Sequence, residues 1–132
     1  MLMPPVSRYM TMHPHAIGPH EKLSSARRLM RNTGIHHLPV MHDEELVGVI
    51  SDRDLFPLNS LRDVAVGDTM SEPVVTVKSE MPLDEVIDLM EREKCGSVVV
   101  IGARGGVEGI FTVTDALRAF RDVLRRSVEN EP

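Results

Sequence analysis

The chain repeats itself once, at a shift of about sixty positions, and this duplication limits what it can fold into. Apolar, small and acidic residues recur at matching places in the two halves. The matches pair Met10 with Met70, Leu23 with Leu83, Leu29-Met30 with Leu89-Met90, Leu38-Pro39-Val40 with Val98-Val99-Val100, Gly48-Val49-Ile50-Ser51 with Gly109-Ile110-Phe111-Thr112, and Asp54 with Asp115. Two copies are too few for a solenoid, so we expect each copy to bury its apolar face against the other.

The second copy predicts the element order β-α-β-β-α. A β-rich run over 74–77 precedes apolar residues at helical spacing, and we expect that helix to end at Gly96. Strands at 98–101 and 107–112 flank a glycine-containing turn and should form a hairpin. A long helix from about Thr114 follows, because an apolar stripe runs through Leu117, Phe120, Leu124 and Val128.

The first copy predicts the same order. Its apolar pattern gives a helix over 23–33 that ends at Gly34, and then strands at 38–41 and 46–51. Its last helix should end near Phe56, because the proline that follows would remove a helical hydrogen bond and crowd the preceding turn. We place the first repeat at residues 6–62, the second at 63–127, and a polar, frayed tail at 128–132.

Composition narrows the range of functions. The formal charge is −5 and aromatic residues make up 3% of the chain, which disfavours a nucleic-acid binder because such proteins need clustered cations and stacking platforms. No stretch approaches the roughly 18 apolar residues of a membrane span, and the first residues lack a secretory signal, so we expect a cytoplasmic protein. The single cysteine, Cys95, has no partner for an internal disulfide, and we interpret it as a packed residue.

Three features together carry a resemblance. They are the duplicated β-α-β-β-α order, the phrase His37-Leu38-Pro39-Val40, and the pattern Gly-x-x-Ser/Thr-x-x-Asp at 48–54 and 109–115. Over about residues 6–125 the chain resembles a CBS-domain pair, the module named after cystathionine β-synthase. The resemblance implies an α/β fold of two tandem repeats, packed pseudo-symmetrically with small sheets facing each other. It also implies clefts that take AMP, ADP, ATP, NAD or S-adenosylmethionine, and association into a disc-like homodimer.

The main binding candidates are Asp54 with Ser51, and Asp115 with Thr112. Each carboxylate could accept both hydroxyls of a ribose, in charge-assisted contacts of roughly 1.5–3 kcal/mol per bond when desolvated, and the adjoining helix N-terminus favours a phosphate. The resemblance gives the aspartates this ribose role and puts the Ser and Thr hydroxyls near the phosphates. The spacing is equally that of a helix capping box, which needs no ligand, so both interpretations stay open.

An adenine slot needs apolar walls with backbone hydrogen-bonding groups at its edge. The resemblance places one slot around Ala16-Ile17 and His37-Leu38-Pro39, and the other around Thr76-Val77 and Ser97-Val98. The apolar members of both sets also fit core positions, so packing is the alternative for Ile17, Val77 and Val98.

The two clefts should differ in affinity. Val99 stands where the first copy has a proline, and Thr114 stands where the first copy has Arg53. Arg53 can reach a phosphate as a forked cation and Thr114 cannot, although an ion pair of Arg53 with Asp52 or Asp54 is the alternative.

All six histidines lie in the first copy: His13, His15, His20, His36, His37 and His42. An extended His13-x-His15 could present two imidazoles to zinc or nickel. No thiolate is near in sequence, and adjacent His36 and His37 would point to opposite faces of a strand, so we predict no metal site. A second hypothesis is that His36 or His37 is a pocket residue that responds to pH, because imidazole titrates near neutrality.

The chain offers no nucleophile with a base, no phosphate loop with its lysine and no paired carboxylates at a telling spacing, so we predict that it is not an enzyme. The leading hypothesis is a regulatory sensor, in which an adenosine-containing ligand shifts the packing between repeats or protomers and alters contacts with an effector protein. The competing hypothesis is a ligand-free dimerisation or scaffold module whose aspartates are helix caps. A weaker one is a nucleic-acid-binding regulator that uses Arg118, Arg121, Arg125 and Arg126, although interspersed acidic residues favour a solvated face.

Overall fold

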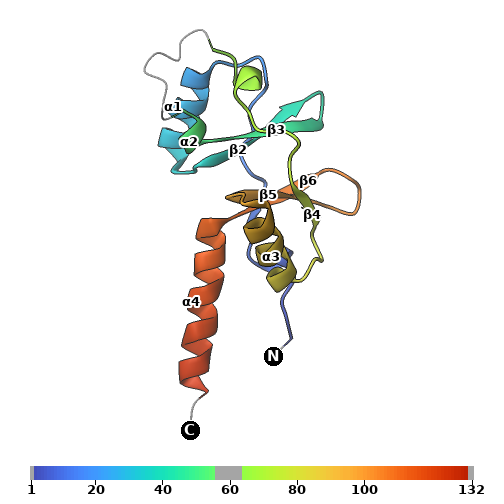
Figure 1. Ribbon diagram of the computed structural model, residues 1–132, viewed down its shortest axis with the longest axis vertical. Helices are drawn as coiled ribbons and strands as arrows, with labels where there is room; N and C mark the ends of the chain where they lie inside the picture. The colour runs from blue at the N-terminus through green and yellow to red at the C-terminus, as the bar shows by residue number, and fades with distance from the viewer. Residues whose placement is uncertain (1, 56–63, 131–132) are drawn as a thin grey trace. The chain divides into compact units, whose positions relative to one another are not determined.

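The structure is a computed structural model that describes residues 2–55 and 64–130. The chain forms two compact units (Figure 1). The central unit comprises Pro14–Val75, and the C-terminal unit comprises Met1–His13 together with Thr76–Pro132. The repeats in the sequence and the units in space therefore differ, because the start of the first repeat belongs to the unit built from the second.

The central unit is a β-hairpin covered by helices. Its elements are α1 (Leu23–Thr33), β2 (His37–His42), β3 (Glu45–Ser51), α2 (Asp52–Leu55) and the 3-10 helix η2 (Val66–Asp68). Strands β2 and β3 pair antiparallel, and Asp43 and Glu44, both with positive φ, make the turn between them. Helix α1 ends at Gly34 as predicted, because the left-handed conformation there, with φ of 74°, costs a glycine little.

The C-terminal unit has a four-stranded sheet with the order β1-β6-β5-β4. Its elements are η1 (Val6–Arg8), β1 (Thr11–Met12), β4 (Thr76–Lys78), α3 (Leu83–Glu93), β5 (Ser97–Ile101), β6 (Val107–Thr112) and α4 (Val113–Glu129). Strand β4 runs parallel to β5 because α3 forms the crossover between them, and the other pairs are antiparallel. Tandem β-α-β-β-α repeats in a mixed α/β fold are thus confirmed.

Equivalent segments complete the two units. The segment around η1 lies beside β6, and the segment around η2 lies beside β3. In the C-terminal unit the Met10 side chain lies over Gly109, and in the central unit the Met70 side chain lies over Gly48. A Cβ at either glycine would collide with the methionine, so both glycines permit the close approach of the incoming segment.

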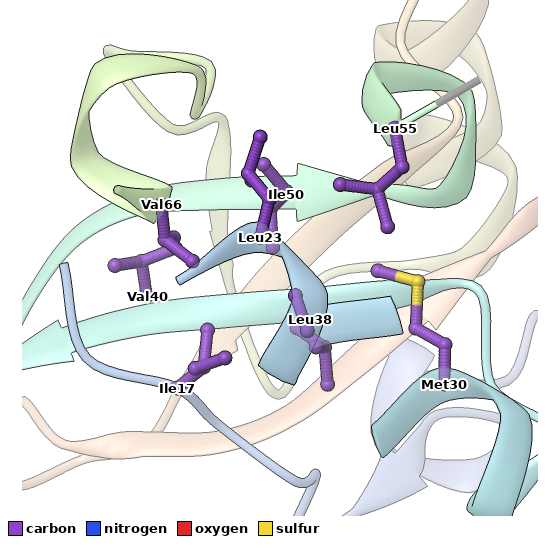
Figure 2. Close-up of a cluster of buried hydrophobic side chains, with 9 residues drawn as sticks. Ile17, Leu23, Met30, Leu38, Val40, Ile50, Leu55 and Val66 are labelled. Carbon is purple, nitrogen blue, oxygen red and sulfur yellow. The ribbon is translucent and has the colours of Figure 1, made fainter. Parts of the chain in front are cut away.

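The core of the central unit lies between the hairpin and the helices (Figure 2). Leu23 from α1, Leu38 from β2 and Ile50 from β3 are fully buried. Burying each such side chain stabilises the fold by roughly 1.5–3 kcal/mol. This small cluster therefore fixes the end of β3, where Ser51 lies and after which Asp54 follows. The complete cluster consists of Ile17, Leu23, Ala26, Met30, Leu38, Val40, Ile50, Leu55 and Val66.

Two element boundaries differ from their predicted positions. The expected end of the α3 helix at Gly96 is wrong, because Lys94 already takes the left-handed conformation, with φ of 55°, and its N–H donates to the carbonyls of Met90 and Glu91. Helix α4 includes Val128 and Glu129, the first residues of the expected tail. Positions 56, 131 and 132, where a helix end and the rest of the tail were expected, lie outside the described residues.

Helix α4 exposes the apolar stripe that its sequence pattern predicts. Leu117 is 64% exposed and Phe120 is 58% exposed, whereas Asp115 and Ala119 are the buried residues of this helix. Figure 1 shows the helix, in red, continuing well past the end of α3. Despite this stripe, none of the helices described is both long and apolar enough to cross a membrane.

Candidate functional site

Each unit has a Ser/Thr–Asp pair where a strand runs into a helix. At the junction of β3 and α2, the N–H and the hydroxyl of Ser51 donate to Oδ2 of Asp54, over 2.8 and 3.1 Å. At the junction of β6 and α4, the N–H and the hydroxyl of Thr112 donate to Oδ2 of Asp115, over 3.0 and 3.3 Å. The predicted pairs therefore form, and each aspartate folds back on the residue that precedes its helix.

The cap is more complete in the C-terminal unit. The N–H of Asp115 donates back to the Thr112 hydroxyl over 3.4 Å, which closes a capping box at the start of a 17-residue helix. Helix α2 has four residues, and both bonds from Ser51 run to the same oxygen of Asp54. The other oxygen, Oδ1 of Asp54, takes part in neither bond and can accept a hydroxyl from outside the chain.

Asp115 has two further donors. Arg118, one turn along α4, forms an ion pair with Oδ1 of Asp115, and the Thr11 hydroxyl of β1 donates to the same oxygen over 3.5 Å. Asp115 is only 4% exposed, whereas Asp54 is half-buried. Both oxygens of Asp115 are thus engaged by groups of the protein itself.

The sequence prediction missed Arg118 and Thr11 as neighbours of this carboxylate. The sequence pattern assigns Arg118 only to a charged helix face. However, Asp115 and Arg118 are opposite charges three positions apart on a helix, and this spacing commonly indicates a side-chain pair. Thr11 lies 104 positions from Asp115, and no sequence spacing could indicate that contact.

One residue expected in each slot lies beside a Ser/Thr–Asp pair. In the register of the hairpins, His37 is the cross-strand partner of Ser51, and Ser97 is the cross-strand partner of Thr112. His37 is half-buried, and Ser97 is buried, with 8% exposed. The first residue of β2 therefore lies beside Ser51, and the first residue of β5 lies beside Thr112.

The apolar candidates are core residues. The Ile17 side chain packs with Leu38 in the cluster of Figure 2, while its N–H donates to the carbonyl of Pro39 over 3.1 Å. Pro39 is fully buried as well, and in the C-terminal unit Val77 and Val98 are buried at 5% and 0% exposure. These side chains support the strand ends, and the adjoining Ala16 and Thr76 are exposed.

The cations and polar groups after each strand differ between the units. Arg53 and Thr114 are both exposed. Asp52 pairs with His36 over 3.0 Å, and within the described residues no ion pair joins Arg53 to Asp52 or Asp54, so the expected alternative for Arg53 is wrong. The guanidinium of Arg53 remains accessible to an anion.

The histidines form small surface contacts. The His20 and His42 rings meet edge to face with centroids 5.3 Å apart, and His42 lies 3.4 Å from Asp43. Across residues 2–55 and 64–130, no three histidine, cysteine or acidic side chains gather closely enough to hold a metal ion. Cys95 is half-buried, and this burial raises the pKa of its thiol, which therefore stays protonated at neutral pH.

The fold and the two pairs define a duplicated α/β module with a carboxylate at equivalent places in both units. The sequence model of the CBS domain matches the chain twice, at residues 6–58 and 62–122. The chain belongs to the CBS-domain family, which confirms the resemblance seen in the sequence.

Individual relatives support this assignment. The chain is similar to inosine-5'-monophosphate dehydrogenase of Thermoplasma acidophilum, with 29% identity over 115 residues, which cover 86% of this chain and 23% of the dehydrogenase. The chain thus spans less than a quarter of the first curated relatives it matches.

Two solved structures cover almost the whole chain. One is a protein of Vibrio cholerae assigned to acetoin utilization, with a TM-score of 0.83, 29% identity, and coverage of 99% of this chain and 100% of that chain. The other is CBSX2 in complex with AMP, with a TM-score of 0.79, 27% identity, and coverage of 91% of this chain and 98% of that chain.

Proposed function

We propose that this protein is a non-catalytic regulatory module that binds an adenosine-containing ligand through its Ser/Thr–Asp pairs. The observation that carries the proposal is the Asp54 carboxylate, which is half-buried beside Ser51 and keeps Oδ1 outside the Ser51 bonds. The similar structure CBSX2 was solved with AMP, which supports a ligand of this class. The candidate ligands are AMP, ADP, ATP, NAD and S-adenosylmethionine.

The neighbours of Asp54 suit such a ligand. A ribose diol can donate to the carboxylate in charge-assisted bonds, which are about twice as strong as neutral ones. Arg53 is exposed at the adjoining position and can offer a guanidinium to a phosphate. The backbone around Ala16 and His37, at the ends of the buried cluster, would bound the adenine.

The binding experiment is thermal unfolding of the full chain with each candidate ligand, repeated with Asp54→Asn. A ligand at a hundred times its dissociation constant should stabilise the fold by about 2.7 kcal/mol, or roughly 10 °C for a chain of this size. The variant should lose that shift while its own Tm stays close to that of the unchanged protein. No shift with any ligand would instead favour the scaffold function, which the complete capping box at Thr112 also fits.

We further propose that the module acts as a homodimer that passes ligand occupancy to an effector protein. The support is the exposed apolar stripe of α4, since contiguous apolar surface on a monomer commonly marks an interface. A second copy is the occupant we favour, because closed two-fold pairing is the commonest assembly of soluble proteins. The stripe consists of Val113, Leu117, Phe120, Leu124 and Val128.

The assembly experiment is sedimentation of the unchanged protein and of a double variant, Leu117→Glu with Phe120→Glu. The unchanged chain should sediment as a dimer and the variant as a monomer, because paired carboxylates in an apolar interface are strongly unfavourable. Both side chains are more than half exposed, so the fold of the variant should persist. A monomeric unchanged chain would overturn the homodimer.

A further inference from the structure

We infer that the two binding sites are unequal, because Arg118 closes the one at Asp115 and leaves the one at Asp54 as the site that a ligand occupies first. This inference rests on the proposed function and specifies which of its two carboxylates is used. Arg118 thereby becomes a residue that sets the number of occupied sites in each chain.

The protein's own donors fill the acceptor positions of the Asp115 carboxylate. A carboxylate has two oxygens with about four lone-pair positions in all. At Asp115, Thr112 gives two donors to Oδ2, and Thr11 and Arg118 each give one to Oδ1. A ribose diol could bind there only by displacing a donor, and the bond from the guanidinium is charge-assisted at both ends.

Arg118 is held in place by a second contact. Its Nη2 also donates to the backbone carbonyl of Tyr9 over 3.3 Å, so one guanidinium joins α4 to the segment around η1. The side chain of Arg118 is 47% exposed and its partner carboxylate 5% exposed. The pair thus lies at the rim of the unit, with the arginine covering the buried aspartate.

Among its described residues, the central unit has no counterpart of this arrangement. The shift that takes Asp115 to Asp54 takes Arg118 to position 57, where the chain has a proline and therefore no side-chain donor. The counterpart of Thr11 is Ser71, which pairs with Val49 through the backbone. The Thr11 hydroxyl donates to Asp115, whereas no bond from Ser71 to Asp54 is present among the described residues. The two donors that occupy Oδ1 of Asp115 thus have no counterpart among the described residues near Asp54, which accepts the two bonds from Ser51.

The test is calorimetric titration of the full chain with AMP. We expect one site per chain, lost in Asp54→Asn. Arg118→Met keeps the apolar part of the side chain and removes the charge, so it should add a second site or strengthen a weak second site by about tenfold. Arg125→Met is the matched control, because Arg125 is exposed on the same helix two turns further along, and it should leave one site.

Combined variants separate this inference from the proposed function. Arg118→Met with Asp54→Asn should retain one site, which the further change Asp115→Asn should remove. Two equal sites in the unchanged protein, or no gain in Arg118→Met, would overturn the inference and leave the proposed function standing. No binding of AMP by any of these proteins would overturn the inference and, if the other candidate ligands also fail, the proposed function with it.

A ligand-free measurement checks the ion pair itself. Unfolding of Arg118→Met, Asp115→Asn and the double variant forms a double-mutant cycle. We expect the combined loss of stability to be smaller than the sum of the single losses, because either change alone already breaks the pair. Additive losses would show that Arg118 does not hold Asp115 and would overturn the inference.

Discussion

The two units are built from one repeated pattern, yet their strand-to-helix junctions differ. In the central unit Asp54 is half-buried, is bonded by Ser51 and lies within a short helix. In the C-terminal unit Asp115 is buried, accepts from Thr112, Thr11 and Arg118, and lies in the first turn of a long helix. The same spacing can thus provide an accessible acceptor or a closed structural cap, and the surrounding donors decide which.

The two junctions also differ in the side chains that lie next to them. The Asp52 N–H donates to the carbonyl of His36 over 2.9 Å, and the equivalent Val113 N–H donates to the carbonyl of Gly96 over 3.2 Å. The side chains then differ, because those of His36 and Asp52 form a hydrogen bond while Gly96 and Val113 cannot. Backbone geometry is therefore shared between the units, and the chemistry offered to a ligand is not.

The largest expected effect compares the equivalent core residues Phe111 and Ile50, both fully buried. Phe111→Ala should cost about 4 kcal/mol and Ile50→Ala about 3 kcal/mol, because the larger side chain leaves the larger cavity. Urea unfolding of both variants measures the difference. A smaller loss at Phe111 would mean that the C-terminal unit collapses around the cavity more readily than the central unit.

A second comparison uses the glycines under the two methionines. A Cβ at Gly109 would lie 2.8 Å from the backbone oxygen of Thr11, whereas the neighbours of a Cβ at Gly48 are all atoms of the flexible Met70 side chain. Gly109→Ala should therefore cost about 2 kcal/mol and Gly48→Ala less than about 1 kcal/mol. Equal losses in urea unfolding would show that the segment around η1 moves as easily as Met70.

Apolar spacing predicted most helices and strands of both units, because a helix or strand that buries one face repeats with its own period. It could not predict which unit each incoming segment completes. Val6 and Val66 are both fully buried, and Met10 and Met70 lie over equivalent glycines, so apolar spacing does not distinguish the two segments. Only the three-dimensional contacts show that the segment around η1 belongs to the unit of the other repeat.

The candidate site was predictable in part for a similar reason. The motif spacing identified both aspartates, since a cap and a ribose contact require the same carboxylate position. The accessibility of Asp115 depends on Thr11 and Tyr9, which contact Asp115 and Arg118 from the far end of the chain. Arg53 and Thr114 predict an inequality between the two sites, and the contacts of Arg118 are a second reason to propose it.

A third comparison tests the caps. Thr112→Ala should cost about 1 kcal/mol, because it removes the N-cap hydroxyl of a long helix. Ser51→Ala should cost roughly half of that, since α2 has only four residues to stabilise. Thermal unfolding of the two variants gives the difference, and Thr112→Ser is the control that should restore most of the loss. A larger loss at Ser51 would contradict the view that the C-terminal cap is the structural one.

The smallest effect concerns the pair that only the central unit has. The side chains of His36 and Asp52 are 63% and 49% exposed, so solvent and salt screen their attraction. Asp52→Asn should change the free energy of unfolding by no more than about 0.5 kcal/mol, and Val113→Thr at the equivalent exposed position should change it no more. Urea unfolding at low and high salt makes the measurement. A loss above 1 kcal/mol that salt does not reduce would mean that the pair fixes the strand end beside Asp54, so the two junctions would differ in rigidity as well as in donors.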